Sequence, residues 1–194
     1  MSAPDNNGRV FWTTAAAVIC LDVATKVLAV RSLDVHIPRR VVGDVVRLTL
    51  AFNPGAAFSM SLGEYSRYIF GAFAVIALFI LWRLNRTTAS GDMTRVLALG
   101  LAWGGAAGNL LDRFRSPRGV VDFIDIGVGD VRFWTFNVAD SAVTIGALLL
   151  AWVLWKEDRA AADSAAATAA GAAGRPGESG SDGSSGGGEA RSSS

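Results

Sequence analysis

Residues 10–30 read VFWTTAAAVICLDVATKVLAV, a run in which only Asp22 and Lys26 carry a charge. A helix rises about 1.5 Å per residue, so this run would be about 30 Å long, which is the thickness of a bilayer's hydrocarbon core. The apolar character continues past both charged residues, and no small-x-small cleavage pattern follows it. We therefore expect a retained membrane-spanning helix rather than a cleaved leader.

Three further segments have the same character, with almost no charge over a length that approaches a bilayer span. They are residues 68–82, 96–111 and 136–155, of which only the last contains a charged residue, Asp140. Together with the first run they predict a mainly α-helical membrane protein with four transmembrane helices. We expect the helices over residues 10–30, 66–84, 94–112 and 136–156.

The composition separates this body from a polar tail. Apolar residues make up 51% of the 194 residues and the mean hydropathy is +0.36, yet residues 157–194 contain no Leu, Ile, Val or aromatic residue. This tail has too little apolar surface to offset the entropy of ordering, so we expect a disordered extension after a domain of residues 1–156. A net charge of +1 argues against a nucleic-acid partner, and one His and one Cys argue against a metal site.

The first connection, residues 31–67, differs from the other loops. Residues 41–50 are rich in β-branched side chains and partly alternate, and Asn53-Pro54-Gly55 is a turn signal. We therefore predict a small β-rich segment over about residues 40–60. The Arg and Lys counts of the loops do not fix the orientation in the membrane, although the short second loop is dense in Arg, which favours a cytoplasmic position.

Polar residues occur where a membrane protein can least tolerate them. With four crossings, the end of the first helix, the end of the third and the start of the fourth lie on one side of the membrane, together with two loops. The polar residues near those ends or in those loops are Asp22, Lys26, Asn53, Asn109, Asp112, Arg113, Asp122, Asn137 and Asp140. Since a central Asp, Lys or Arg costs at least about 2.5–3.5 kcal/mol on insertion, so many polar groups at one depth predict a functional site.

Each of these groups also has a plainer structural explanation. Asp22 and Lys26 are four residues apart and are able to form a neutralised pair between helices. Asp112 and Arg113 can mark the membrane interface, and Asn137 is a favoured N-cap residue. A stripe of small residues at four-residue spacing favours close helix packing, although it would also let a substrate helix pass nearby. The stripe consists of Gly100, Gly104 and Gly108.

Acid pairs offer one chemistry that needs no Ser, Cys, His or metal. Two carboxylates that share a site can hold one proton between them. The ionised member can then take a proton from water while the protonated member polarises a carbonyl. The best-placed acids are Asp122 in the third loop and Asp140 in the first turn of the fourth helix, with Asp112 as a third candidate. The spacing alone does not choose among them.

Two other functions compete with this hypothesis. A Ser/Lys peptidase would use Ser59 or Ser141 with Lys26, but it needs a neutral Lys, which Asp22 one turn away opposes. A small transporter would carry polar residues through the middle of the bilayer in inverted halves, and neither pattern is evident.

Five blocks of the sequence resemble, in order, those of the bacterial lipoprotein signal peptidases (signal peptidase II). The blocks are residues 22–26 (DVATK), 53–59 (NPGAAFS), 104–113 (GGAAGNLLDR), 119–123 (GVVDF) and 136–141 (FNVADS). Together they span nearly the whole body of the chain. Pro54 and the long tail are minor departures from the family pattern.

The resemblance implies a fold and a reaction. It implies four transmembrane helices with a small extracytoplasmic β-cradle, and an intramembrane aspartyl endopeptidase without a cofactor. Such an enzyme removes the signal peptide from diacylglyceryl-modified prolipoproteins by cleaving before the lipidated Cys. The implied catalytic residues are Asp122 and Asp140. The implied binding or supporting residues are Asp22, Lys26, Asn53, Gly55, Asn109, Asp112, Arg113 and Asn137.

The resemblance also implies partners and a location. The partners are prolipoprotein signal peptides that carry diacylglyceryl-Cys, membrane lipid and globomycin-like inhibitors, and we expect a monomer. The location is the bacterial cytoplasmic (inner) membrane, with both termini and the tail in the cytoplasm and the active site near the outer face.

Overall fold

The computed structural model describes residues 6–54 and 65–173, with side chains described as far as residue 169. The chain divides into two compact units, Met1–Trp155 and Lys156–Ser194, and the predicted site residues all belong to the first. Gly55 and the last six residues of the predicted β-rich segment (residues 55–60) lie outside the described residues, as does Ser59 of the alternative Ser/Lys site.

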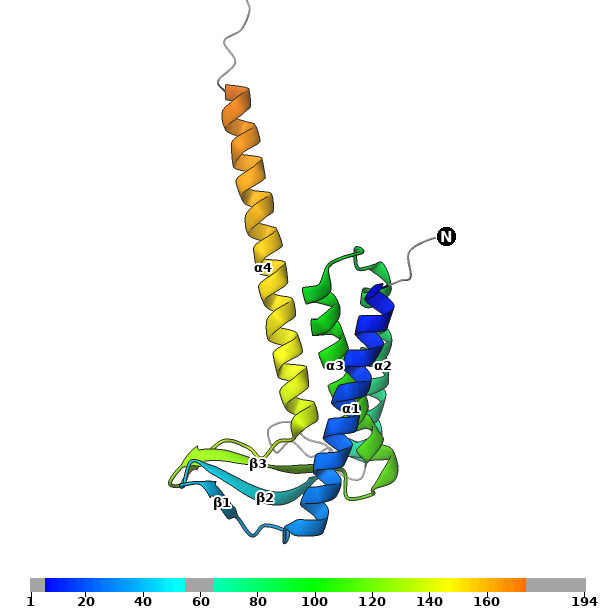
Figure 1. The fold of residues 1–194 in the computed structure, drawn as a ribbon, viewed down its shortest axis with the longest axis vertical. Helices are drawn as coiled ribbons and strands as arrows, with labels where there is room; N and C mark the ends of the chain where they lie inside the picture. The colour runs from blue at the N-terminus through cyan, green and yellow to red at the C-terminus, as the bar shows by residue number, and fades with distance from the viewer. Residues whose placement is uncertain (1–5, 55–64, 174–194) are drawn as a thin grey trace, which may run out of the picture. The chain divides into compact units, whose positions relative to one another are not determined.

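Helices dominate the described residues, as predicted. They are α1 (Asn6–Ser32), α2 (Ser66–Thr87), α3 (Met93–Arg115) and α4 (Val138–Ala173) (Figure 1). Three of them are long and apolar enough to cross a membrane, over Asn6–Ser32, Ser66–Thr87 and Val138–Ala169. Among the described helices α3 falls short of that hydropathy, so a fourth crossing stays a prediction.

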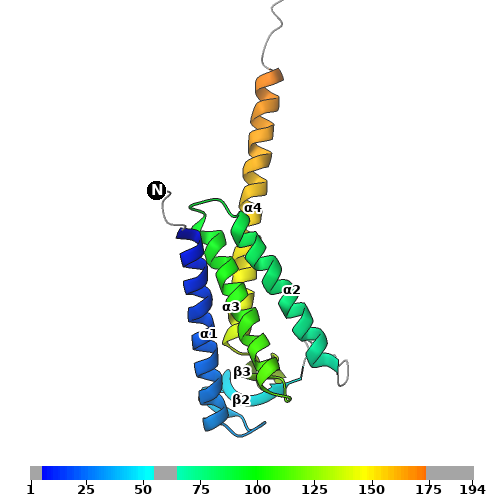
Figure 2. The same ribbon diagram turned by 90° about the vertical axis from the view of Figure 1, so that its right-hand side faces the viewer.

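The low hydropathy of α3 has a structural reason, which is its central position in the first unit. It packs against both α1 and α2 and lies between them in Figure 2. Nine of its residues are buried, four of them glycines. A helix surrounded by protein needs small residues for close packing more than it needs large apolar side chains for lipid.

Two successive glycines of α3 allow helices to approach from opposite sides. A Cβ atom at Gly104 would stand 2.8 Å from the Ala15 carbonyl oxygen of α1, and one at Gly105 would stand 2.3 Å from the Ala139 carbonyl oxygen of α4. Real Cβ atoms do not make contacts this short, so only glycine permits these helix separations. The predicted glycine stripe, which includes Gly100 and Gly108, faces α1 throughout, in agreement with the packing interpretation.

A four-stranded antiparallel sheet lies at the end of the helices where α1 and α3 end and α4 begins (Figure 1). Its strands, in order across the sheet, are β1 (Arg39–Val42), β2 (Val46–Asn53), β3 (Val120–Val128) and β4 (Val131–Arg132). Half of the sheet therefore comes from the third loop, where the sequence indicated only β-forming residues around Asp122. The pairing of Ala51 with Asp122 and of Asn53 with Val120 brings the end of β2 beside the start of β3.

Helix α4 extends beyond the predicted end of the body. The sequence predicted a disordered tail from residue 157, whereas the helix continues to Ala173. Residues 157–173 are rich in alanine, which has the highest intrinsic helix propensity and forms a helix without an apolar face to bury. The prediction counted only core-forming side chains and so missed this local preference.

Candidate active site

The candidate site forms where β3 and the chain that leaves β4 meet the first turn of α4. Asp122 is the third residue of β3, and Asp140 lies in the first turn of α4. Asn137, immediately before α4, is completely buried, and Asp122 is 3% exposed. The fold therefore brings two acids that are far from each other in sequence to one place.

Asn137 contacts both acids. Its side-chain Nδ2 donates to Asp122 Oδ1 at 2.7 Å, and its Oδ1 accepts from the Asp140 backbone N–H at 2.9 Å. In return, the Asn137 backbone N–H donates to Asp140 Oδ2 at 3.2 Å. The exchange between Asn137 and Asp140 is a reciprocal capping interaction at a helix start, which agrees with the predicted N-cap. One residue thus begins the helix and holds both carboxyl groups.

Asn109 of α3 extends this network toward α1. Its Nδ2 donates to Asp140 Oδ1 at 2.7 Å, so both Asp140 oxygens accept hydrogen bonds. Its Oδ1 accepts from Lys26 Nζ at 2.9 Å and from Asn137 Nδ2 at 3.2 Å. Three residues, Asp140, Lys26 and Asn137, therefore hold the Asn109 amide in one orientation.

Lys26 is surrounded by negative charge. Its Nζ lies 2.8 Å from Asp22 Oδ2 and 2.8 Å from Asp112 Oδ2. Asp22 also accepts from the Ala139 backbone N–H at 2.9 Å, and Asp112 from the Val121 backbone N–H at 3.2 Å. These two acids therefore tie α4 and β3 to the helices that carry them. The predicted pairing of Asp22 with Lys26 is confirmed, and it is part of a larger network.

This environment changes the titration of Asp122. Burial raises its pKa to about 7, and the negative charge of Asp140 contributes in the same direction. Hydrogen bonds from the side chains of Asn137 and Asn53, together with the charge of Lys26, oppose the rise. A carboxyl group with this pKa is half protonated near neutral pH, which is what an acid pair with a shared proton requires.

Arg113 lies near the two acids, and one N–H group of its side chain is available to bind a further acceptor. Its Nη1 donates to the Asn109 carbonyl oxygen at 3.0 Å, and its charge interacts with Asp140 and Asp122. Its buried Nε–H finds no acceptor within the described part of the chain. Arg113 also lines a mainly apolar pocket of about 220 Å³ between α2 and α3. Sequence reasoning missed this pocket, for which aromatic residues near the helix ends were the one available signal.

The structure thus connects nearly all the predicted site residues through direct contacts. The connected residues are Asp22, Lys26, Asn53, Asn109, Asp112, Arg113, Asp122, Asn137 and Asp140. A second buried acid of β3 escaped the sequence reasoning. Asp125 binds Arg132 Nε at 2.6 Å and Thr49 at 3.0 Å, and so joins three strands rather than entering the site. The available sequence signal for Asp125 was a single acidic residue within a stretch of β-forming residues.

The alternative Ser/Lys site gains no support from the described residues. The Lys26 amine contacts two carboxylates and one amide oxygen, whereas such a site needs it beside a serine hydroxyl. The Ser141 hydroxyl donates instead to the Asn137 carbonyl oxygen at 3.0 Å.

Comparison with known proteins gives a consistent result. Residues 14–156 match the family model for signal peptidase (SPase) II. A lipoprotein signal peptidase of Mycolicibacterium smegmatis is 45% identical over 153 residues, which is 76% of this chain but only 61% of that protein. One of Desulforapulum autotrophicum is 41% identical over 141 residues, which is 70% of this chain and 85% of that protein.

A solved structure agrees with these matches. A bacterial membrane enzyme determined at 2.3 Å by the in meso method superimposes with a TM-score of 0.69 and 29% identity, over 75% of this chain and 87% of that one. The family model covers most of the body, including both candidate acids. The chain therefore belongs to the signal peptidase II family.

Proposed function

We propose that this protein is a membrane-embedded aspartyl endopeptidase that removes signal peptides from diacylglyceryl-modified prolipoproteins by cleaving before the lipidated Cys. Family membership and the lipoprotein signal peptidases among its relatives support the substrate class. The single observation that supports the acid chemistry is the contact of Asn137 with both Asp122 and Asp140.

The proposed reaction uses one proton shared by the two acids. Asp140 takes a proton from a water molecule as the water oxygen bonds to the scissile carbonyl carbon, while protonated Asp122 gives its proton to the carbonyl oxygen. The resulting diol collapses when Asp140 gives its proton to the amide nitrogen and Asp122 takes one back from a hydroxyl group. The C–N bond breaks, one water molecule is consumed and both acids return to their starting state.

The other residues of the network divide into two proposed roles. Asn53, Asn109 and Arg113 bind the substrate backbone near the acids, and the unpartnered Nε–H of Arg113 is available to a substrate carbonyl. Gly55 belongs with them by its motif. Lys26 holds Asp22 and Asp112 in place and acts as a positioning residue rather than as a base.

A second feature beside the acids suits a lipidated substrate. The pocket next to Arg113 is mainly apolar and lies between α2 and α3, where an acyl chain can enter from the bilayer. We propose that it receives one chain of the diacylglyceryl group, and that globomycin-like inhibitors compete for the same region.

The proposed topology has four crossings in the bacterial cytoplasmic membrane, with α3 as the internal helix. The polar network then lies near the outer face, the sheet lies outside the cytoplasm, and both termini are cytoplasmic. Water is available there, and proteolysis consumes water. We propose that a single copy of the chain is sufficient for activity, because one chain supplies both acids and the Asn137 and Asn109 side chains that contact them.

The test is cleavage of a diacylglyceryl-modified precursor by Asp122→Asn and Asp140→Asn, each purified in detergent with its thermal stability measured. Both variants should lose cleavage and remain folded. Asp130→Asn, the same change at an exposed residue of the β3–β4 turn, is the matched control and should cleave normally. Near-normal turnover by either site variant would refute the assignment of the acid pair.

A further inference from the structure

A second pocket, of about 230 Å³, lies on another side of the helices, between α1, the end of α3 and the sheet. Val23, Val27 and Val30 of α1 line it, at a spacing that places them on one helix face. Phe52 of β2 and Val121 of β3 complete its apolar wall. This surface is suited to a hydrocarbon chain, and the peptidase reaction proposed above does not use it.

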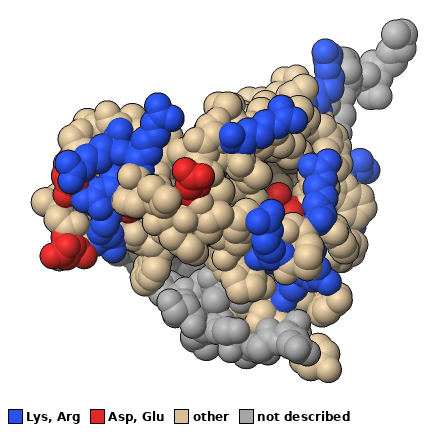
Figure 3. Space-filling view, turned by 90° about the horizontal axis from the view of Figure 1, so that it is seen from below, with Lys and Arg blue, Asp and Glu red and all other residues tan. Residues whose placement is uncertain are grey.

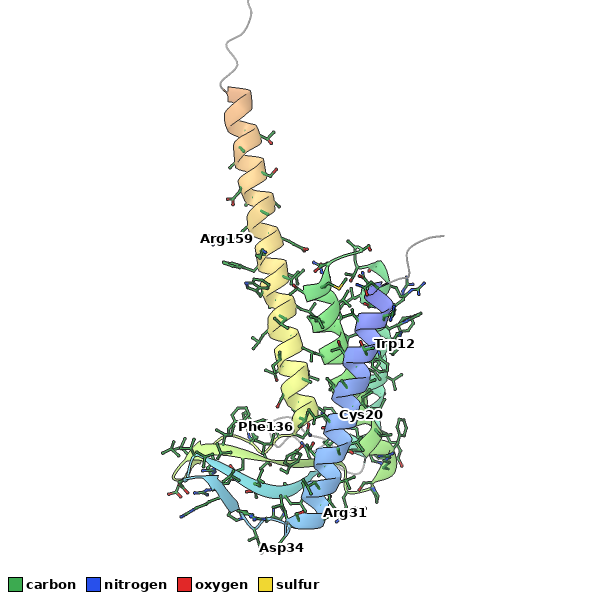
Figure 4. All side chains as sticks on the ribbon, in the orientation of Figure 1. Trp12, Cys20, Arg31, Asp34, Phe136 and Arg159 are labelled. Carbon is green, nitrogen blue, oxygen red and sulfur yellow. The ribbon has the colours of Figure 1, made fainter. Side chains whose placement is uncertain are left out.

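Three arginines surround the same pocket. Arg31 lies in the last turn of α1 and Arg115 in the last turn of α3, and Arg118 follows shortly after. Figure 4 shows Arg31 at the end of α1 nearest the sheet. The Arg118 guanidinium stacks on the Phe52 ring at 3.9 Å, which fixes it at the pocket wall. Guanidinium groups that line one pocket suit a phosphate, which each can bind through paired N–H donors.

Few acidic residues offset the charge of these arginines at the pocket. Asp112 is the one acid among the described residues that line the pocket, and Lys26, which also lines it, is ion-paired with Asp112. The three arginines therefore leave a net positive charge over an apolar floor. Figure 3, which views this end of the molecule, shows basic side chains more widely than acidic ones.

The positions of the arginines and valines along the helices favour a phospholipid as the molecule that fills this pocket. Arg31 lies in the last turn of α1, a candidate membrane span, so in the proposed topology it lies at the level of the lipid headgroups, while Val23 and Val27 of the preceding turns lie at the level of the acyl chains. We propose that this pocket binds an anionic phospholipid, with its phosphate on Arg31, Arg115 and Arg118 and one acyl chain along the valine face of α1.

The test measures lipid binding directly and does not depend on peptidase activity. The full chain is purified in detergent and titrated with phosphatidylglycerol or phosphatidylcholine, and bound lipids are counted by native mass spectrometry. The variant is Arg31→Gln/Arg115→Gln, which leaves the stacked Arg118 in place. The matched control is Arg39→Gln/Arg40→Gln, the same charge change on the exposed strand β1.

We expect one tight phosphatidylglycerol site in the wild type and in the control. At about 1 kcal/mol per basic residue near a membrane surface, the variant should bind this lipid about 25-fold more weakly. Phosphatidylglycerol should also raise the thermal stability of the wild type more than that of the variant, because a ligand of the folded state stabilises it. Arg31→Lys/Arg115→Lys, which keeps the charge, should still bind phosphatidylglycerol preferentially. It provides the comparison with the wild type if the Gln variant is too unstable to use.

Three results would overturn the proposal. Equal binding of both lipids by the wild type would remove the anionic preference. An equal loss in the β1 control would mean that binding follows total surface charge. Full competition by soluble glycerol phosphate would assign the arginines to a free phosphate rather than to a lipid.

Discussion

Replacement of Asn137 tests the proposed chemistry through pH, because this residue donates a 2.7 Å hydrogen bond to Asp122 and lowers the pKa of that carboxyl group. A hydrogen bond to a charged group contributes about 1.5–3 kcal/mol, and 1.36 kcal/mol corresponds to one pKa unit. Removal of the donor should therefore raise the pKa of Asp122 from about 7 by about one to two units. Since the reaction needs protonated Asp122, the alkaline limb of the activity profile should move to higher pH.

Two substitutions separate this effect from helix capping. Asn137→Ser keeps an N-cap oxygen for the Asp140 backbone N–H but lacks the amide donors, whereas Asn137→Ala loses both. Both variants should show the alkaline shift, and only the Ala variant should lose about 1 kcal/mol more of stability from the missing cap.

The assay is cleavage of a lipidated precursor at a series of pH values, with each variant's thermal unfolding as the control for folding. Total rates will fall in both variants, so the comparison concerns the position of the alkaline limb and not its height. An alkaline limb that stays at the wild-type position in Asn137→Ser, or moves to lower pH, would refute the role assigned to this amide.

Four further outcomes are expected. Lys26→Ala leaves two carboxylates without their cation and should destabilise the protein by about 3–5 kcal/mol in denaturation, with partial activity at low temperature; unchanged stability would contradict this. Relative to the wild type, Asp122→Asn should gain up to about 4 kcal/mol of stability as pH rises from about 4 to about 7, because over that range the unfolded wild-type chain ionises this carboxyl group while the folded state keeps it protonated. Gly105→Ala should cost about 1–3 kcal/mol by overpacking against α4, while Gly71→Ala, whose new methyl group would meet only an ordinary contact at 3.9 Å, should be neutral or slightly stabilising in the same unfolding assay. Truncation after Arg159 should leave precursor cleavage intact, since the candidate site lies in the preceding unit, and a large loss of activity would reveal a role for the tail.

The sequence predicted those contacts that form between residues a few positions apart in the chain. The four-residue separation of Asp22 and Lys26 predicted their ion pair, and the Asn at position 137 predicted a helix start. Both outcomes depend on contacts within one or two helical turns. Charge-free runs likewise predicted the helices, because a bilayer span imposes a length and an apolarity that are legible in any one segment.

Long-range pairing could not be predicted in the same way. Nothing near Asp122 in the sequence indicates that β3 pairs with β2 or that Asn137 reaches the Asp122 carboxyl group. The register of a sheet depends on partners distant in the chain, and so does the burial that raises the pKa of Asp122. The motif resemblance predicted which residues form the candidate site, and only the folded structure shows the contacts among them.

The glycine-rich character of α3 has a consequence for experiments on related chains. Its small residues are required by neighbours on two sides, so its apolarity falls below that of a lipid-facing helix. An algorithm that counts only strongly hydrophobic stretches would assign an odd number of passes and place the two chain ends in different compartments. If all four helices cross, as proposed, reporter fusions interpreted on that count would be inverted for everything after residue 115. A fusion in the α2–α3 connection and one in the β3–β4 hairpin distinguish the two counts, because they should report opposite compartments only if α3 crosses.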